Sequence, residues 1–78
     1  MNVALQIRIA DGFYQAGRQQ IKNDPAQARK NLGTAKEIIQ LCLRANPPDL
    51  NKEETRIELE RVISQIRELL VGLELAHP

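Results

Sequence analysis

Side chains that could act as nucleophiles or transfer protons are few in this chain of 78 residues. It has one cysteine, Cys42, and one histidine, His77, which is the penultimate residue. A Ser–His or Cys–His pair would depend on that terminal histidine, which we expect to be solvated. A reactive thiol also needs a nearby cation or histidine, and the neighbouring Arg44 points elsewhere around a helix. We therefore predict that Cys42 is a small apolar side chain of the core.

Carboxylates are concentrated near the C-terminus, at positions typical of the solvated side of a helix. No apolar pocket is visible around them that would raise a pKa for acid–base catalysis. One cysteine and one histidine cannot form a Cys/His metal cluster, and the scattered glycines form no phosphate-binding loop. The sequence therefore predicts no enzyme activity, cofactor or metal. The carboxylates in question are Glu53, Glu54, Glu58, Glu60 and Glu68.

Basic side chains gather around a predicted turn in the first half of the chain. They are the best candidates for contact with an acidic partner or a nucleic acid, and a solvated basic end is the simpler interpretation. Phe13 and Tyr14 are the only aromatic residues, too few for a surface that stacks bases. Nucleic-acid binding is therefore a secondary alternative. The basic residues are Arg18, Lys22, Arg29, Lys30 and Lys36.

The net charge of +1 conceals an asymmetry along the chain. Residues 1–46 carry seven Lys or Arg against three Asp or Glu, whereas residues 47–78 carry four against seven. The two blocks, +4 and −3, either complement each other within one fold or give the surface two faces of opposite sign.

The clearest periodicity predicts a long amphipathic helix over residues 51–75. Its apolar residues recur at steps of three and four, which places them on one side of a helix that other helices must cover. Asn51 and Glu54 resemble a capping box, with Asp49 as the rival N-cap. The stripe consists of Leu59, Val62, Ile66, Leu69, Leu73 and Ala76.

A first helix is predicted over residues 2–22, with two apolar stripes that together span an arc of about 200°. One stripe is Val3, Ile7, Ala10, Tyr14, Gly17 and Ile21, and the other is Leu5, Ile9, Phe13 and Ala16. One side can pack against the protein's own helices, and the other is either further core or an interface. Gly12 and Gly17 each cost about 1 kcal/mol in a helix relative to alanine. They are either local imperfections or points where another helix backbone approaches closely.

A second helix is predicted over residues 25–45, joined to the first by a tight turn. Asp24 suits the N-cap, Pro25 the first helical position, and Asn23 the end of the preceding helix. So short a connection favours an antiparallel hairpin. The apolar stripe here is Ala28, Leu32, Ala35, Ile39 and Cys42, after which Pro47 and Pro48 end the helix.

These elements predict an all-α fold, a three-helix bundle in one domain spanning residues 1–78. No stretch approaches the roughly 18–20 apolar residues of a membrane span, and the N-terminus does not resemble a signal peptide. We therefore expect a cytoplasmic protein without membrane contact. With no possible intramolecular disulfide, so small a core makes self-association a natural source of added stability.

The turn at Asp24 to Ala28, with Leu32 and Ala35 after it, resembles the second half of a tetratricopeptide repeat. The helical order, a tight hairpin and then a longer helix, resembles a microtubule-interacting-and-trafficking domain. Both resemblances imply binding of short peptide or helical segments in grooves between helices. A shorter segment, from Arg8 through Phe13 to Ile21, resembles the phosphoacceptor helix of sensor histidine kinases. Tyr14 stands where that family has its histidine, so no kinase activity carries over.

The favoured hypothesis is therefore a non-enzymatic interaction module: an adaptor, a regulator or a partner-specific chaperone that binds a helical segment. The alternatives are a homodimeric helical bundle and a weak nucleic-acid binder. Apolar residues beyond those that one core needs are the candidates for partner contact, although isolated exposed apolar residues are also ordinary. The candidates are Leu5, Ile9, Phe13, Ile38, Leu41, Val71 and Leu75.

Overall fold

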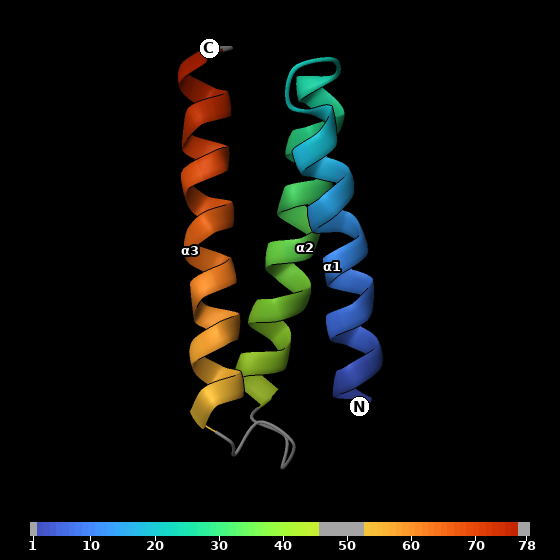
Figure 1. The fold of residues 1–78 in the computed structure, drawn as a ribbon, viewed down its shortest axis with the longest axis vertical. Helices are drawn as coiled ribbons and strands as arrows, with labels where there is room; N and C mark the ends of the chain where they lie inside the picture. The colour runs from blue at the N-terminus through green and yellow to red at the C-terminus, as the bar shows by residue number, and fades with distance from the viewer. Residues whose placement is uncertain (1, 46–52, 77–78) are drawn as a thin grey trace.

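The computed structural model describes residues 2–45 and 53–76, and within these ranges the chain forms three α-helices (Figure 1). They are α1 (Val3–Gln20), α2 (Pro25–Ala45) and α3 (Glu53–Ala76). No strand occurs in the described part of the chain. The predicted all-α, three-helix architecture is confirmed.

The first helix is shorter than predicted at its C-terminal end. At its start, the Asn2 side chain accepts a hydrogen bond of 3.0 Å from the backbone N–H of Leu5, as an N-cap does. At its end, α1 stops at Gln20 rather than Lys22, and residues 21–23 form a turn. The chain must reverse before α2 begins, so Asn23 lies in the turn and not at the helix end. The backbone N–H of Asp24 donates to the Gln20 carbonyl over 2.8 Å and closes this reversal.

The start of α2 follows the predicted capping pattern. The Asp24 carboxylate accepts a hydrogen bond of 3.2 Å from the backbone N–H of Gln27, and Pro25 is the first helical residue. Because the turn is so short, α1 and α2 form the predicted antiparallel hairpin. The predicted caps of the third helix, Asn51 and Asp49, lie outside the described residues; α3 ends at Ala76, one residue beyond the prediction.

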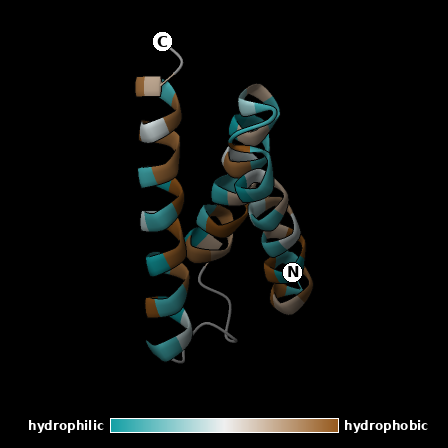
Figure 2. Cartoon of the chain, turned by 45° about the horizontal axis from the view of Figure 1, so that its top comes forward, coloured by the Kyte–Doolittle hydropathy of each residue, from teal (hydrophilic) through white to brown (hydrophobic). Residues whose placement is uncertain are grey.

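The central helix of the arrangement is α2. It packs closely against both α1 and α3, whereas α1 and α3 are in looser contact with each other (Figure 1). The apolar side of α3 is turned toward the hairpin, as Figure 2 shows. None of the three helices in the described ranges carries an apolar stretch long enough to cross a membrane.

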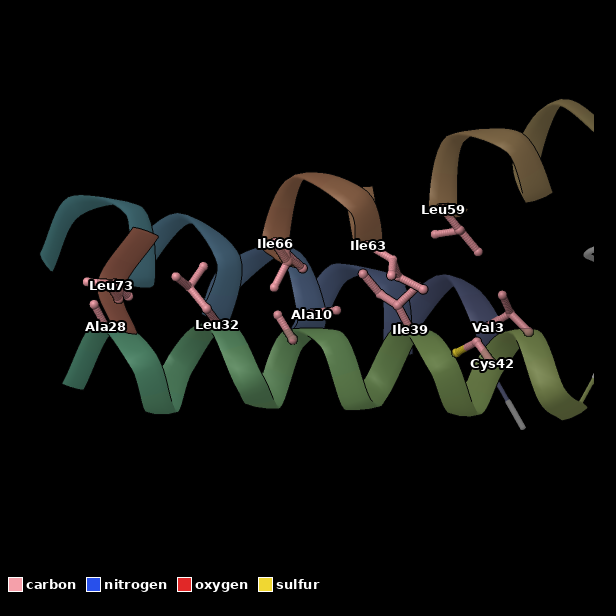
Figure 3. Close-up of a cluster of buried hydrophobic side chains, with 11 residues drawn as sticks. Val3, Ala10, Ala28, Leu32, Ile39, Cys42, Leu59, Ile63, Ile66 and Leu73 are labelled. Atoms are coloured by element: carbon pink, nitrogen blue, oxygen red, sulfur yellow. The ribbon is translucent and has the colours of Figure 1, made fainter. Parts of the chain in front are cut away.

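The core runs along the buried side of α2, where all five residues of the predicted stripe are buried (Figure 3). From α3, Ile63 is buried in place of the predicted Val62 and Leu69, which are partly buried at the edge of the core. Ala76, the last residue of the predicted stripe, is exposed at the helix end. The buried residues are Val3, Ala10, Ala28, Leu32, Ala35, Ile39, Cys42, Leu59, Ile63, Ile66 and Leu73.

The two glycines of α1 have different environments. A Cβ atom at Gly17 would lie 2.7 Å from Cγ of Leu32 and 3.3 Å from the backbone oxygen of Ala28. The absence of a side chain at Gly17 therefore lets α1 and α2 approach closely. A Cβ atom at Gly12 would meet nothing within 4 Å, so Gly12 has no such role.

Candidate protein-interaction surface

The residues predicted to contact a partner lie on two separate sides of the molecule. Leu5, Ile9 and Leu41 are 48 %, 39 % and 55 % exposed and belong to the hairpin. Val71 and Leu75 are 55 % and 79 % exposed and belong to α3. They lie roughly 140–180° around α3 from its buried residue Ile66, at about 100° per residue, and thus point away from the hairpin. The structure does not bring the two groups together.

The hairpin residues share one side, opposite α3. Ile9 and Phe13 of α1 line a shallow groove with Asn31 of α2. Ile38 follows Asn31 by two helical turns on the same side of α2, and Leu41 comes three residues later. We call the surface formed by Leu5, Ile9, Phe13, Ile38 and Leu41 the outer hairpin face.

The antiparallel register aligns the exposed residues of the outer hairpin face. Close to the turn, Gly17 lies against Ala28 and Leu32. At the open end, Val3 and Cys42 belong to the same buried cluster and are both labelled in Figure 3. Because residues of antiparallel helices run past each other in opposite directions, Leu5 is at the level of Leu41. Two exposed leucines, one from each helix, therefore lie at the same level of the hairpin.

Phe13 and Ile38 differ from the other members of the outer hairpin face. Both are half-buried and pack against the core, because their positions on the helices lie close to the α1–α2 contact. They form the base of the face, whereas Leu5, Ile9 and Leu41 project from it. Gly12, Ala16 and Asn31 also line the groove and were not among the predicted contact residues. Ala16 belongs to the second predicted stripe of the first helix, whereas Gly12 and Asn31 carry no apolar signal in the sequence.

The five basic candidates are divided by α3 rather than gathered on one surface. Arg18 lines a groove between α1 and α3, together with Gln65 and Glu68. Lys36 precedes Gln40 by one turn, on the side of α2 that meets Ile63 on the other edge of α3. Lys22, Arg29 and Lys30 are exposed at or next to the turn. These five charges therefore do not form one continuous basic surface, which binding along a nucleic-acid backbone would require.

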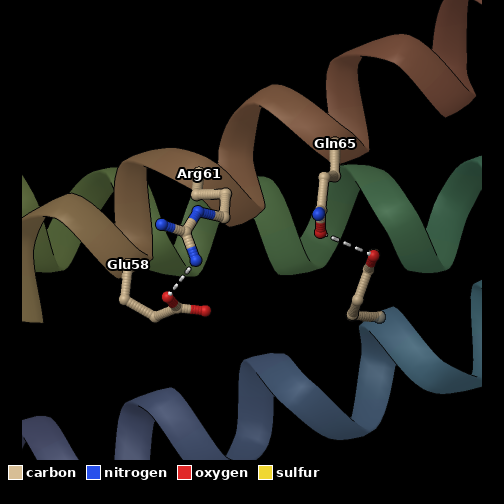
Figure 4. A network of polar contacts seen from close by, with 4 residues as sticks. Glu58, Arg61 and Gln65 are labelled. Carbon is tan, nitrogen blue, oxygen red and sulfur yellow. Dashed lines mark hydrogen bonds and ion pairs between the residues drawn. The ribbon is translucent and has the colours of Figure 1, made fainter.

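Polar side chains span the looser contact between α1 and α3. The hydroxyl of Tyr14 donates a hydrogen bond of 3.1 Å to Oε1 of Gln65, and Cζ of Arg18 lies 5.4 Å from the centre of the Tyr14 ring. Glu58 and Arg61 form an exposed ion pair of 3.0 Å within α3 (Figure 4). An ion pair this exposed contributes little stability, about 0–1 kcal/mol. Of these contacts, the Tyr14–Gln65 hydrogen bond joins α1 to α3, whereas the other two each lie within one helix.

The Cys42 side chain is buried on α2, where burial raises the pKa of its thiol above the ordinary value of 9.0. A raised pKa favours the neutral thiol, which is the poorer nucleophile and metal ligand. Within residues 2–45 and 53–76, no three side chains of the His, Cys, Asp and Glu type gather in a way that could hold a metal ion. His77 lies outside the described residues.

Two surfaces of the hairpin thus have different roles. The side that faces α3 forms the core, and the outer hairpin face carries large apolar side chains, of which Leu5, Ile9 and Leu41 stay exposed among residues 2–45 and 53–76. Searches with models of protein families, with curated proteins and with solved structures found no match to this chain.

Proposed function

We propose that this protein is a non-enzymatic interaction module that binds an amphipathic helix of another protein on its outer hairpin face. The observation that carries the proposal is the groove between α1 and α2 that Ile9 and Phe13 line with Asn31. Leu5, Ile9 and Leu41 of the same two helices are all at least 39 % exposed. The exposed side chains of α1 and α2 form a row on each helix, with the half-buried Phe13 and Ile38 between them. A third helix can pack against such a surface. Large exposed apolar patches of this kind commonly mark binding sites.

The rest of the chain supports a binding role rather than catalysis. Among the described residues no charged side chain is buried. Catalytic acids and bases usually need partial burial, or a close charged partner in a cleft, to tune their pKa values. Leu5, Ile9 and Leu41 do not belong to the buried core, so we expect the core to form without them.

A substitution that places charge on the outer hairpin face tests this function. We expect the double variant L5E/I9E to fold normally, because both positions are exposed and glutamate is a good helix former. It should lose binding to helical peptides by at least about 30-fold, the effect of removing an interface hot spot worth about 2 kcal/mol. The measurement is fluorescence anisotropy with peptides selected by the wild-type protein from a displayed library of amphipathic helices.

The variant V71E/L75E is the matched control, since it places the same two charges on the opposite side of the molecule. It should bind the selected peptides as tightly as the wild type. Equal binding by L5E/I9E and the wild type would contradict the proposal, as would a library that yields no helical binder. Light scattering over a hundredfold dilution completes the test. A stable dimer that L5E/I9E converts to a monomer would assign the face to a second copy of the chain instead.

A further inference from the structure

A second surface, separate from the outer hairpin face, lies where α1 and α3 are in looser contact. Ile7 and Ala10 of α1, Ile39 of α2, and Leu59 and Val62 of α3 form its apolar floor. Three of these five side chains belong to the buried core, and the other two are half-buried against it. The floor is therefore an edge of the core that faces solvent through the gap between α1 and α3. We call this surface the α1–α3 groove.

The size and shape of the α1–α3 groove favour a helix of a partner over a whole small molecule. Its volume is about 260 Å³, which is below the roughly 300–1,000 Å³ of typical ligand pockets. Its lining extends from Ile7 to Arg18 on α1, a length of about 16 Å at 1.5 Å per residue. Because α2 packs closely against both α1 and α3, a helix in this groove would complete a four-helix arrangement.

The charges at the rim of the α1–α3 groove are mainly negative at the end near Ile7. Asp11 of α1 and Glu58 of α3 line the groove, and Glu54 precedes Glu58 by one turn on the same side of α3. Arg61 is the positive charge at this end, and it is paired with Glu58 over 3.0 Å. Three exposed carboxylates thus stand against one exposed guanidinium, a net charge of −2.

The other end of the α1–α3 groove is electrically balanced. Arg18 lines it and lies over the Tyr14 ring, and Glu68 lines the adjoining groove together with Arg18. Among the described residues, α2 contributes no charged side chain to the lining. Arg8 lies about 60° around α1 from Asp11, on the side toward the outer hairpin face. The groove therefore has a direction, with an excess of negative charge at one end only.

We infer that the α1–α3 groove is a second docking site, which takes an amphipathic helix with a basic end. The partner's apolar side chains would contact the floor, and one or two Lys or Arg residues would face Asp11 and Glu58, where opposite charges favour association. A neutral residue suits the end near Arg18. The inference goes beyond the proposed function and does not depend on it, because no residue of the outer hairpin face lines this groove.

A second copy of the chain is the competing occupant of the α1–α3 groove. The apolar surface that a copy would offer is its outer hairpin face, where Arg8 lies near Leu5 and Ile9. Such a contact joins two different surfaces, so it leaves an open groove at one end and an open face at the other. A basic helix of another protein instead closes the groove in a one-to-one complex. The test therefore uses the variant L5E/I9E, in which the competing contact is blocked.

The test is a selection on L5E/I9E from a displayed library of helical peptides with a fixed apolar stripe. Positions at both ends of the stripe contain Asp, Glu, Lys, Arg or Gln in equal proportion, and the peptides lack Tyr and Trp. We expect enrichment of peptides with Lys or Arg at one end. Tyr14 is the only tyrosine of a chain without tryptophan, so its fluorescence reports binding at the groove. The enriched peptide should bind at least about tenfold more tightly than its Glu-substituted counterpart at low salt, and the difference should shrink as salt is added.

A charge-reversal variant with a matched control locates the effect. The variant D11K/E58K should bind the enriched peptide about tenfold more weakly, and the exposed ion pair that it loses adds little stability. The variant E37K/E60K changes the net charge equally at exposed positions outside the groove, and it should keep the affinity. Circular dichroism verifies that both variants remain helical. An equal loss in both would attribute the effect to net charge and overturn the inference.

Amide chemical shifts of the wild-type protein separate this inference from the proposed function. The enriched peptide should shift resonances along residues 7–18 and 58–69. Shifts confined to Leu5, Ile9 and Leu41 would overturn the inference and leave the proposed function standing. A selection on L5E/I9E that enriches no peptide, or enriches acidic ends, would reject the second site alone. Self-association of the wild type that both L5E/I9E and D11K/E58K abolish would assign the groove to a second copy and also overturn the inference.

Discussion

Replacing Leu32 by alanine should destabilise the protein by about 2–5 kcal/mol, the usual cost of removing a fully buried leucine. Leu32 has no solvent exposure and is among the largest fully buried side chains of the described residues. It also lies against Gly17 of α1, where the two helices approach closely. The cavity left by L32A would thus lie within this close contact of α1 and α2, and close packing leaves little room for the structure to relax.

This loss is large relative to the total free energy of unfolding. A domain of 78 residues is expected to have a free energy of unfolding of about 4–12 kcal/mol, at 0.05–0.15 kcal/mol per residue. L32A should therefore lower the melting temperature by more than about 8 °C, or prevent folding at room temperature. Urea unfolding followed by circular dichroism measures the change. The control is L41A, at an exposed leucine of the same helix, which should change stability by no more than about 0.5 kcal/mol. Similar effects of L32A and L41A would contradict the assigned core.

The same substitution at the two glycines of α1 should have opposite effects. At Gly17, the new methyl group of alanine would lie within 3 Å of the Leu32 side chain and 3.3 Å from a backbone oxygen of α2. Leu32 is fully buried and the backbone cannot yield, so α1 and α2 must move apart. We expect G17A to destabilise the protein by about 1–3 kcal/mol, the cost of overpacking a core, despite alanine's higher helix propensity.

At Gly12, the methyl group would meet open space, and only the helix propensity changes. G12A should therefore stabilise the protein by up to about 1 kcal/mol. Thermal unfolding of G17A, G12A and the wild type measures the two changes in stability. Two stabilising substitutions would mean that the α1–α2 distance is not limited at Gly17. Two destabilising ones would mean that α1 is covered on the side of Gly12 as well.

The sequence alone predicts the elements and most of the core. The apolar residues of the second helix recur at steps of four and three, and this period can be satisfied only if one side of a helix is buried. All five residues of that stripe are buried in the structure. Asp24 and Pro25 likewise predict the start of α2, because capping depends on residues that are neighbours along the chain. Local interactions of this kind can be predicted from a single sequence.

The tertiary structure decides which of several equivalent apolar sides of a helix is buried. Leu5 and Ile9 have the same periodicity as Val3 and Ala10, yet the first pair is exposed and the second is buried. The difference arises from the direction in which α2 packs, which periodicity does not specify. Periodicity places Gly17 in the stripe of Val3 and Ala10 and Gly12 outside it, but only the position of Leu32 shows that another helix approaches at Gly17.

The candidate surface depends even more on the packing of the helices. Leu5 and Leu41 are far apart in the chain and come to the same level of the hairpin because α1 and α2 run antiparallel with the register set at Gly17. Val71, equally exposed, is excluded from this surface because α3 covers the opposite side of α2. Periodicity along one helix determines which of its residues are apolar. Contacts between helices determine which of those residues remain exposed for a partner.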